Sequence, residues 1–295
     1  MIPRHLRSAL FLIAGSVLAT GLFAQAPAIA FPAASPAGSI KQKVGVADLE
    51  VSYNRPSARG RTVFGGLVPY DAIWRTGADT ATRLKLSTPA KLNGTAVPAG
   101  TYELFTIPGK AEWTVILQAA KERPQWGSYA YDQKNDTVRF TAKPVALAAP
   151  VESLTFEVAN LTAGSATLAL AWEKTRVPIT VEIDNAGALV PQIEAVMAAG
   201  GDIKPMTYFG SAMFYYENNL DLDKALAWMD AGLATQPKAY WMIYRKGLLL
   251  AKKGDKAGAI AAANLSMELA AQETRGAELK QEYTRLNQAL IDSLK

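Results

Sequence analysis

Cysteine is absent from this chain of 295 residues, and histidine occurs once, as His5. Without thiols the chain forms no disulfide, no thiolate zinc site and no iron–sulfur cluster, and it offers no cysteine nucleophile. Because His5 lies in a predicted signal peptide, we expect the exported chain to lack imidazole as well. That excludes a Ser-His-Asp triad, histidine-ligated metals and imidazole acid–base catalysis. The composition therefore predicts no cofactor and no tightly bound soft or borderline metal, and it leaves only hard ions such as calcium with oxygen ligands.

Acidic residues are missing from positions 1–30. Two arginines precede an apolar run at 8–23, which is short for a membrane span, and Ala28-Ile29-Ala30 fits the signal-peptidase rule. We predict a Sec signal peptide at 1–30, cleaved after Ala30, and a periplasmic or secreted protein. An uncleaved N-terminal anchor is the alternative. No later stretch is apolar enough to span a membrane.

Strong charge of one sign is also lacking. Lys and Arg number 31 and Asp and Glu number 26, a formal net charge of +5, and no long block of like charge occurs. Proteins that bind nucleic acids usually carry a basic patch or stripe. We therefore expect no nucleic-acid partner.

Apolar side chains recur with a period of two over residues 39–183. Leu49, Val51 and Tyr53 alternate with polar residues, and six later runs do the same. This alternation is typical of half-buried strands, and Asn93-Gly94 is a strong signal for a two-residue hairpin. We predict a flexible lead at 31–38, followed by an all-β, antiparallel, jelly-roll-like sandwich of eight or nine strands at 39–183.

The period becomes helical after residue 184. Residues 184–205 are predicted to form a linker with a short helix from Pro191 to Ala199. Over 206–295, two units match at about the 34-residue spacing of tetratricopeptide repeats, and the last helix has the stripe of a capping helix. A generic pair of helical hairpins is the alternative. We predict an all-α, tetratricopeptide-like module that docks a protein partner.

Several runs in the β part carry a resemblance to a known family. They are SPAGSIKQKVG at 35–45, SYNRPSARGRTVFGGLVPYDAIWRTGADTAT at 52–82, VPAGTYELFTIPGKAEWTVIL at 97–117, QWGSYAYD at 125–132 and VESLTFEVANLTAGSATLALAWEKTRVPI at 151–179. In these runs the chain resembles the domain-of-unknown-function 2911 family of exported bacterial proteins. The resemblance implies an exported β domain, often followed by helical repeats, and it implies no activity. The family usually carries Asn where this chain has Asp79.

Arginine is concentrated between residues 54 and 83. Arg55, Arg61 and Arg75 lie in this stretch with Trp74 and Asp79, among four glycines and few strand signals. A guanidinium binds carboxylates, sulfates and phosphates through two hydrogen bonds, and loops on a rigid sandwich often carry binding residues. These five residues are candidates for a pocket that takes an anionic small molecule or glycan. The structural alternative is that Arg75 pairs with Asp79 and Trp74 fills the sandwich end. In that case Arg75→Ala would act mainly on stability.

Aromatic residues form a second candidate group after Pro124. Trp126, Tyr129 and Tyr131 follow within seven residues of that proline. Exposed rings can stack on sugars or bases, so Trp126 and Tyr129 are further candidate ligand contacts. Packing of this cluster over an open end of a sheet is the alternative.

Carboxylates are the acid–base groups that remain for catalysis. Glu103, Glu112, Asp132 and Glu157 are predicted on or near strands with their side chains in solvent, and the sequence shows no catalytic pair. We therefore predict an exported envelope protein that acts as a non-catalytic binding or assembly module. The alternative is a hydrolase or lyase that uses carboxylates on an anionic envelope glycan.

Overall fold

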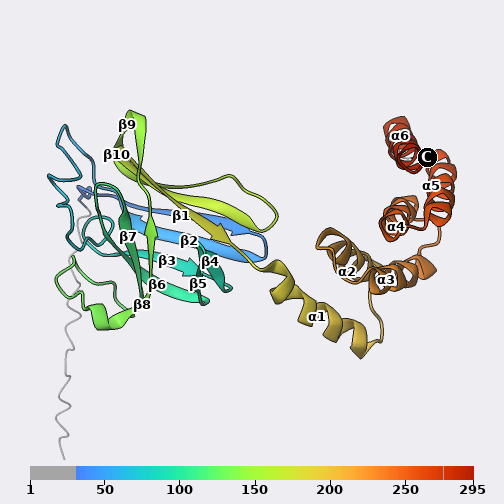
Figure 1. Ribbon diagram of the computed structural model, residues 1–295, viewed down its shortest axis with the longest axis horizontal. Coiled ribbons are helices and arrows are strands. Elements are labelled where there is room, and N and C mark those ends of the chain that lie inside the picture. The colour runs from blue at the N-terminus through green and yellow to red at the C-terminus, as the bar shows by residue number, and fades with distance from the viewer. Residues whose placement is uncertain (1–30, 275) are drawn as a thin grey trace, which may run out of the picture.

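The computed structural model describes residues 31–274 and 276–295, so the predicted signal peptide lies outside the described residues. The described chain forms a β domain followed by helices (Figure 1). The strands are β1 (Ala37–Val44), β2 (Ala47–Asn54), β3 (Thr82–Leu86), β4 (Ala90–Leu92), β5 (Thr95–Val97), β6 (Gly100–Ile107), β7 (Trp113–Ala119), β8 (Asp136–Ala142), β9 (Val145–Ala159) and β10 (Ser165–Glu182). The prediction of an antiparallel β domain followed by a helical module is confirmed, with ten strands in place of eight or nine.

The strands form two antiparallel sheets, with the orders β1-β2-β3-β6-β7-β8 and β5-β4-β10-β9. The chain leaves the first sheet after β3, forms the β4–β5 hairpin in the second, and returns at β6. Asn93 and Gly94 make the turn of that hairpin, with φ angles of 47° and 80°. Two successive positive φ angles are what a type I′ turn requires, so the predicted hairpin is confirmed.

Both sheets contribute to one hydrophobic core, which makes the β domain a sandwich. In β2 the buried residues alternate with exposed or half-buried ones, as the period of two predicts. Four aromatic side chains, Phe64, Trp74, Trp113 and Trp172, meet inside this core. Phe64 and Trp74 come from the long segment between β2 and β3. That segment is therefore tied to the core by its own large side chains.

One strand is longer than the sequence pattern predicts. Two of the alternating runs in the sequence, around Leu170 and around Ile179, lie in the single strand β10. The pairing of β10 with β9 shifts register on both sides of Glu173, whose φ is 50°. A bulge of this kind adds a residue without ending the strand, and it interrupts the alternation that marks a strand in sequence.

The helices are α1 (Asn185–Ala199), α2 (Pro205–Glu217), α3 (Leu222–Thr235), α4 (Tyr240–Lys253), α5 (Lys256–Ala271) and α6 (Ala277–Ser293). The start of α1 corrects the prediction, because Pro191 lies inside the helix and not at its beginning. Asp184 caps the helix by accepting a hydrogen bond from the Gly187 N–H. The side chain of Asn185 then bonds Val46 and Ala163 of the β domain.

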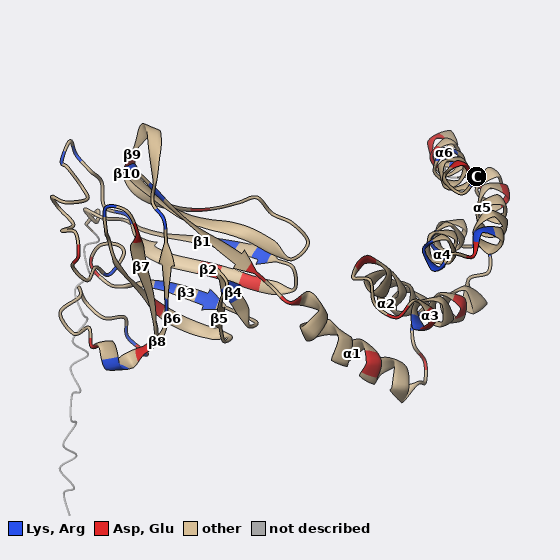
Figure 2. Cartoon of the chain, in the orientation of Figure 1, with Lys and Arg blue, Asp and Glu red and all other residues tan. Residues whose placement is uncertain are grey.

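The helices bury two hydrophobic clusters of their own. One contains Ala212, Met229 and Leu249, and the other contains Tyr244 and Leu290. Helix α2 packs on α3, and α5 packs on both α4 and α6. Among the described residues, no helix is both long and apolar enough to cross a membrane. Figure 2 shows basic and acidic residues scattered over the strands and the helices.

Candidate ligand-binding pocket

A pocket of about 540 Å³ opens between the segment that joins β2 to β3 and the loop that joins β7 to β8. Its lining includes five of the seven predicted site residues, and these are Arg61, Trp74, Arg75, Asp79 and Tyr129. The other two, Arg55 and Trp126, are not among the lining residues. Residues that lie 68 positions apart in sequence, from 61 to 129, thus share one cavity.

Two tryptophans of the sandwich core form part of the pocket wall. Trp74 and Trp172 stack with their ring centroids 6.0 Å apart and their planes 21° from parallel. The Trp74 indole N–H donates to the Gly77 carbonyl, and that of Trp172 donates to the Glu152 carbonyl. Because both rings are buried and both N–H groups are bonded, this wall is fixed by the fold.

Arg75 is the unusual residue of the pocket. Its Nε atom is buried and has no hydrogen-bond partner in the described part of the chain. Across residues 31–274 and 276–295, Arg75 forms no ion pair with Asp79 or with any other acid, so the predicted internal pair is wrong. Trp74 does pack in the hydrophobic core of the sandwich. The charge of Arg75 has no partner among the residues that the structure describes.

The backbone around Arg75 is strained. Thr76 has a φ of 58° and is only 1% exposed, and Asp79 has a φ of 56°. Such angles are uncommon outside glycine and unfavourable for a β-branched residue, at a cost of about 1–3 kcal/mol each. The Thr82 hydroxyl donates to the Thr76 carbonyl, and the Thr76 hydroxyl bonds that of Thr106. These bonds hold the strained turn, and strain of this kind is concentrated at ligand sites.

Arg61 and Asp79 complete the charged lining. Arg61 is exposed and donates from Nε to the Ala58 carbonyl and from Nη2 to the Ser57 carbonyl. Among the described residues, no side chain or backbone donor bonds the Asp79 carboxylate. The Asp79 main-chain carbonyl accepts from the Gly127 N–H, which ties this segment to the loop that carries Tyr129.

Arg55 and Trp126 lie elsewhere. Arg55 donates from Nε to the Leu154 carbonyl and from Nη2 to the Thr155 hydroxyl, so it fastens the end of β2 to β9. Trp126 is 64% exposed and Tyr129 is 91% exposed, whereas Tyr131 packs against Phe105. Of these three aromatic residues, only Tyr131 packs against the sheet as the alternative predicted.

Glu103 corrects the expectation that the strand carboxylates face solvent. It is fully buried, and it accepts hydrogen bonds from the main-chain N–H and the side-chain amide of Gln125. Arg83 lies 3.9 Å from the same carboxylate. Glu112, Asp132 and Glu157 are exposed as expected. Alternation places Glu103 outside the sandwich core, but the loop between β7 and β8 covers that face, and no local signal predicts the cover.

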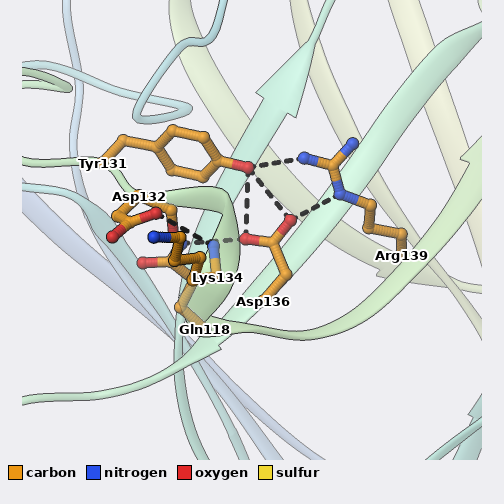
Figure 3. Close-up of polar contacts among 6 residues, drawn as sticks. All are labelled: Gln118, Tyr131, Asp132, Lys134, Asp136 and Arg139. Carbon is orange, nitrogen blue, oxygen red and sulfur yellow. Dashed lines mark hydrogen bonds and ion pairs between the residues drawn. The ribbon is translucent and has the colours of Figure 1, made fainter.

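A polar network fixes the far end of this loop (Figure 3). Tyr131 donates to the Asp136 carboxylate and accepts from Arg139, which also bonds Asp136. Gln118 of β7 donates to the same carboxylate and to the Asp132 carbonyl. Burial, followed by the bond to Asp136, raises the pKa of Tyr131 above its ordinary value. Glu103 and this network together hold the loop that presents Trp126 and Tyr129.

The lining suits binding better than acid–base catalysis. Asp79 is the one acidic residue among the lining side chains, while glycoside hydrolysis by carboxylates needs two. Within the described residues, no three His, Cys, Asp or Glu side chains gather closely enough to hold a metal ion. What the pocket offers is two guanidinium groups, one carboxylate and an aromatic wall.

The comparisons with known proteins agree with the boundaries of this domain. Residues 35–181 match the model of a family described as "Protein of unknown function (DUF2911)". No curated protein and no solved structure matches the chain. The match covers every residue that lines the pocket, from Ser35 to Trp172, and it ends before the helices. The β domain is therefore similar to this family of unknown function over residues 35–181.

Proposed function

We propose that the β domain is a non-catalytic binding module whose pocket takes the anionic group of a small molecule or glycan. The observation that carries the proposal is the charge of Arg75, which lies in a concave site and is unpaired within residues 31–274 and 276–295. Buried or half-buried arginines are normally paired, because an unpartnered polar group costs about 1–3 kcal/mol. A bound carboxylate, sulfate or phosphate would supply the missing negative charge through the accessible part of the guanidinium.

The hydrolase or lyase alternative has less support. It needs an acid and a base near one another, and Asp79 is the single carboxylate of the lining. Glu103 is buried beneath the loop between β7 and β8 and is bonded to Gln125. Both features favour a protein that holds its ligand without transforming it.

We also propose that the protein is exported and acts in the cell envelope. The support is the sequence of residues 1–30, with its basic start, short apolar core and small residues before Phe31. Mass spectrometry of the mature protein tests this. Cleavage after Ala30 predicts an N-terminus at Phe31, and an intact N-terminus in the membrane fraction would contradict it.

Docking of a protein partner by tetratricopeptide-like helices remains part of the proposal. It is supported by a groove of about 630 Å³ that α3, α4 and α5 line with Leu233, Ile243, Leu250 and Leu265. Pull-down from envelope extract, with and without residues 184–295, is the test. A partner that is retained after removal of these residues would contradict the assignment to the helices.

Titration of the intact protein with acetate, phosphate and sulfate tests the pocket. Trp74 and Trp172 line it, so their fluorescence should change when an anion binds. Arg75→Gln should remove the response. Arg123→Gln is the matched control, because Arg123 is exposed and does not line the pocket, and it should leave the response intact. Equal responses in both variants would refute the proposal.

A further inference from the structure

We infer that the pocket takes a small zwitterion of the amino-acid class, with its carboxylate on Arg75 and its ammonium on Asp79. The inference rests on the proposed anion binding and names the ligand class for the same site. It follows from the opposite charges that line the pocket and are not paired with each other.

Arg75 and Asp79 are four residues apart and line one cavity, yet no ion pair joins them. Two such side chains would ordinarily relax toward each other, because opposite charges attract strongly where solvent is partly excluded. The left-handed turns at Thr76 and Asp79 fix the intervening backbone instead. A ligand with both charges would satisfy both side chains, and a simple anion would satisfy one.

Asp79 also counts against a compact anion such as phosphate. A carboxylate beside a bound phosphate or sulfate repels it, which lowers the affinity that Arg75 provides. Arg61 only partly offsets this repulsion, because it is exposed and its Nε and Nη2 groups are committed to two backbone carbonyls. An ammonium group on the ligand turns the same carboxylate into an attractive contact.

The remaining lining suits the side chain of an amino acid. Leu67 and Ile73 provide apolar surface, and the Tyr129 ring is open to stacking. A volume of about 540 Å³ lies within the range of small-molecule sites. An acidic sugar is the competing ligand, since its hydroxyl groups could donate to Asp79 while its carboxylate meets Arg75.

Calorimetric titration of the intact protein separates these ligands. The probes are glycine, L-alanine, L-leucine and L-phenylalanine, then 3-phenylpropionate, which lacks the ammonium group, phenethylamine, which lacks the carboxylate, and glucuronate. We expect at least one amino acid to bind, and the analogue that lacks either charge to bind about tenfold or more weakly.

Two variants assign the charges to their residues. Asp79→Asn keeps the size of the side chain, so it should weaken amino-acid binding about tenfold or more while 3-phenylpropionate binds as well as before or better. Arg75→Gln should weaken the binding of both the amino acid and 3-phenylpropionate. Glu112→Gln removes an exposed carboxylate outside the pocket and should change neither affinity. If Asp79 has only a structural role, Asp79→Asn will weaken the binding of both ligands together, and the assignment is overturned.

The remaining outcomes are also decisive. If 3-phenylpropionate binds as tightly as every amino acid, or if glucuronate binds most tightly, the zwitterion is wrong while anion binding by Arg75 stands. If no probe shows binding that Arg75→Gln removes, the proposed function fails with it.

Discussion

Arg75 and its neighbours form a charged cavity in a way that lowers the stability of the folded state. A guanidinium with a buried, unpartnered Nε and two non-glycine residues with positive φ all destabilise the folded state. Natural proteins keep such features where function requires them. By contrast, Arg55 donates hydrogen bonds to β9 and stabilises the fold. Two arginines that look alike in sequence thus have different roles.

Glu103 is a stabilising residue that the sequence pattern hides. Glu103→Gln removes the negative charge that receives two bonds from Gln125 and faces Arg83. We expect a loss of about 2–3 kcal/mol in the free energy of unfolding of the β domain, as is typical for hydrogen bonds to a buried charge. Urea denaturation measures it, with the exposed Glu112→Gln as control. Equal midpoints for the two variants would show that the buried carboxylate does not anchor the loop.

At the scale of elements, two loops build the site on a rigid sandwich. The segment between β2 and β3 brings Arg61, Arg75 and Asp79, and the loop between β7 and β8 brings Tyr129. The second loop depends on the network of Gln118, Tyr131, Asp136 and Arg139 (Figure 3). The geometry of the pocket therefore depends on contacts far from its lining.

The pH dependence of stability tests this network. The pKa of Tyr131 is raised above 10.0 by burial and by the bond to Asp136, so the folded state holds the phenolic proton more tightly than the unfolded chain does. Its contribution is complete below pH 10.0 and is lost as the pH rises through the raised folded pKa. Between pH 10.0 and the raised folded pKa, the free energy of unfolding of the wild type should fall more steeply than that of Tyr131→Phe. Parallel pH profiles from urea denaturation would contradict it.

Local sequence patterns predicted which elements form better than they predicted where the elements end and which loops pack over them. Alternation identified β2 and Asn93-Gly94 identified a hairpin, because both signals depend on neighbouring residues alone. The bulge at Glu173 and the helical position of Pro191 were missed, since pairing with β9 and the Asp184 cap override the local preference.

The sequence predicted some of the residues that line the candidate site, but it did not predict the contacts that these residues make. The density of arginine, glycine and aromatic residues pointed to five of the lining residues. Whether Arg75 pairs with Asp79 depends on the turn at Thr76, whose positive φ no propensity rule favours. The burial of Glu103 depends on a loop that begins more than a dozen residues later in the chain.

At the scale of the whole molecule, the two parts have separate hydrophobic cores. The main β cluster contains no helical residue, and the two helical clusters contain no strand residue. Contact at the boundary is made by Asn185, which bonds Val46 and Ala163. Domains with their own cores generally unfold as separate units.

We therefore expect two calorimetric unfolding transitions. Residues 31–187, which keep Asn185 and the Asp184 cap, should fold alone and reproduce one of them. A single transition in the intact protein, together with an unfolded fragment, would mean that the helices complete the β core.

Paired measurement of stability and ligand binding in Arg75→Met tests the central claim most directly. Methionine keeps much of the length and apolar surface of the side chain while it removes the unpartnered Nε and the charge. The account predicts a free energy of unfolding that is unchanged or higher by about 1 kcal/mol, together with loss of the binding response to carboxylates. A destabilised variant that still binds carboxylates like the wild type would show that Arg75 serves the fold, and would contradict the account.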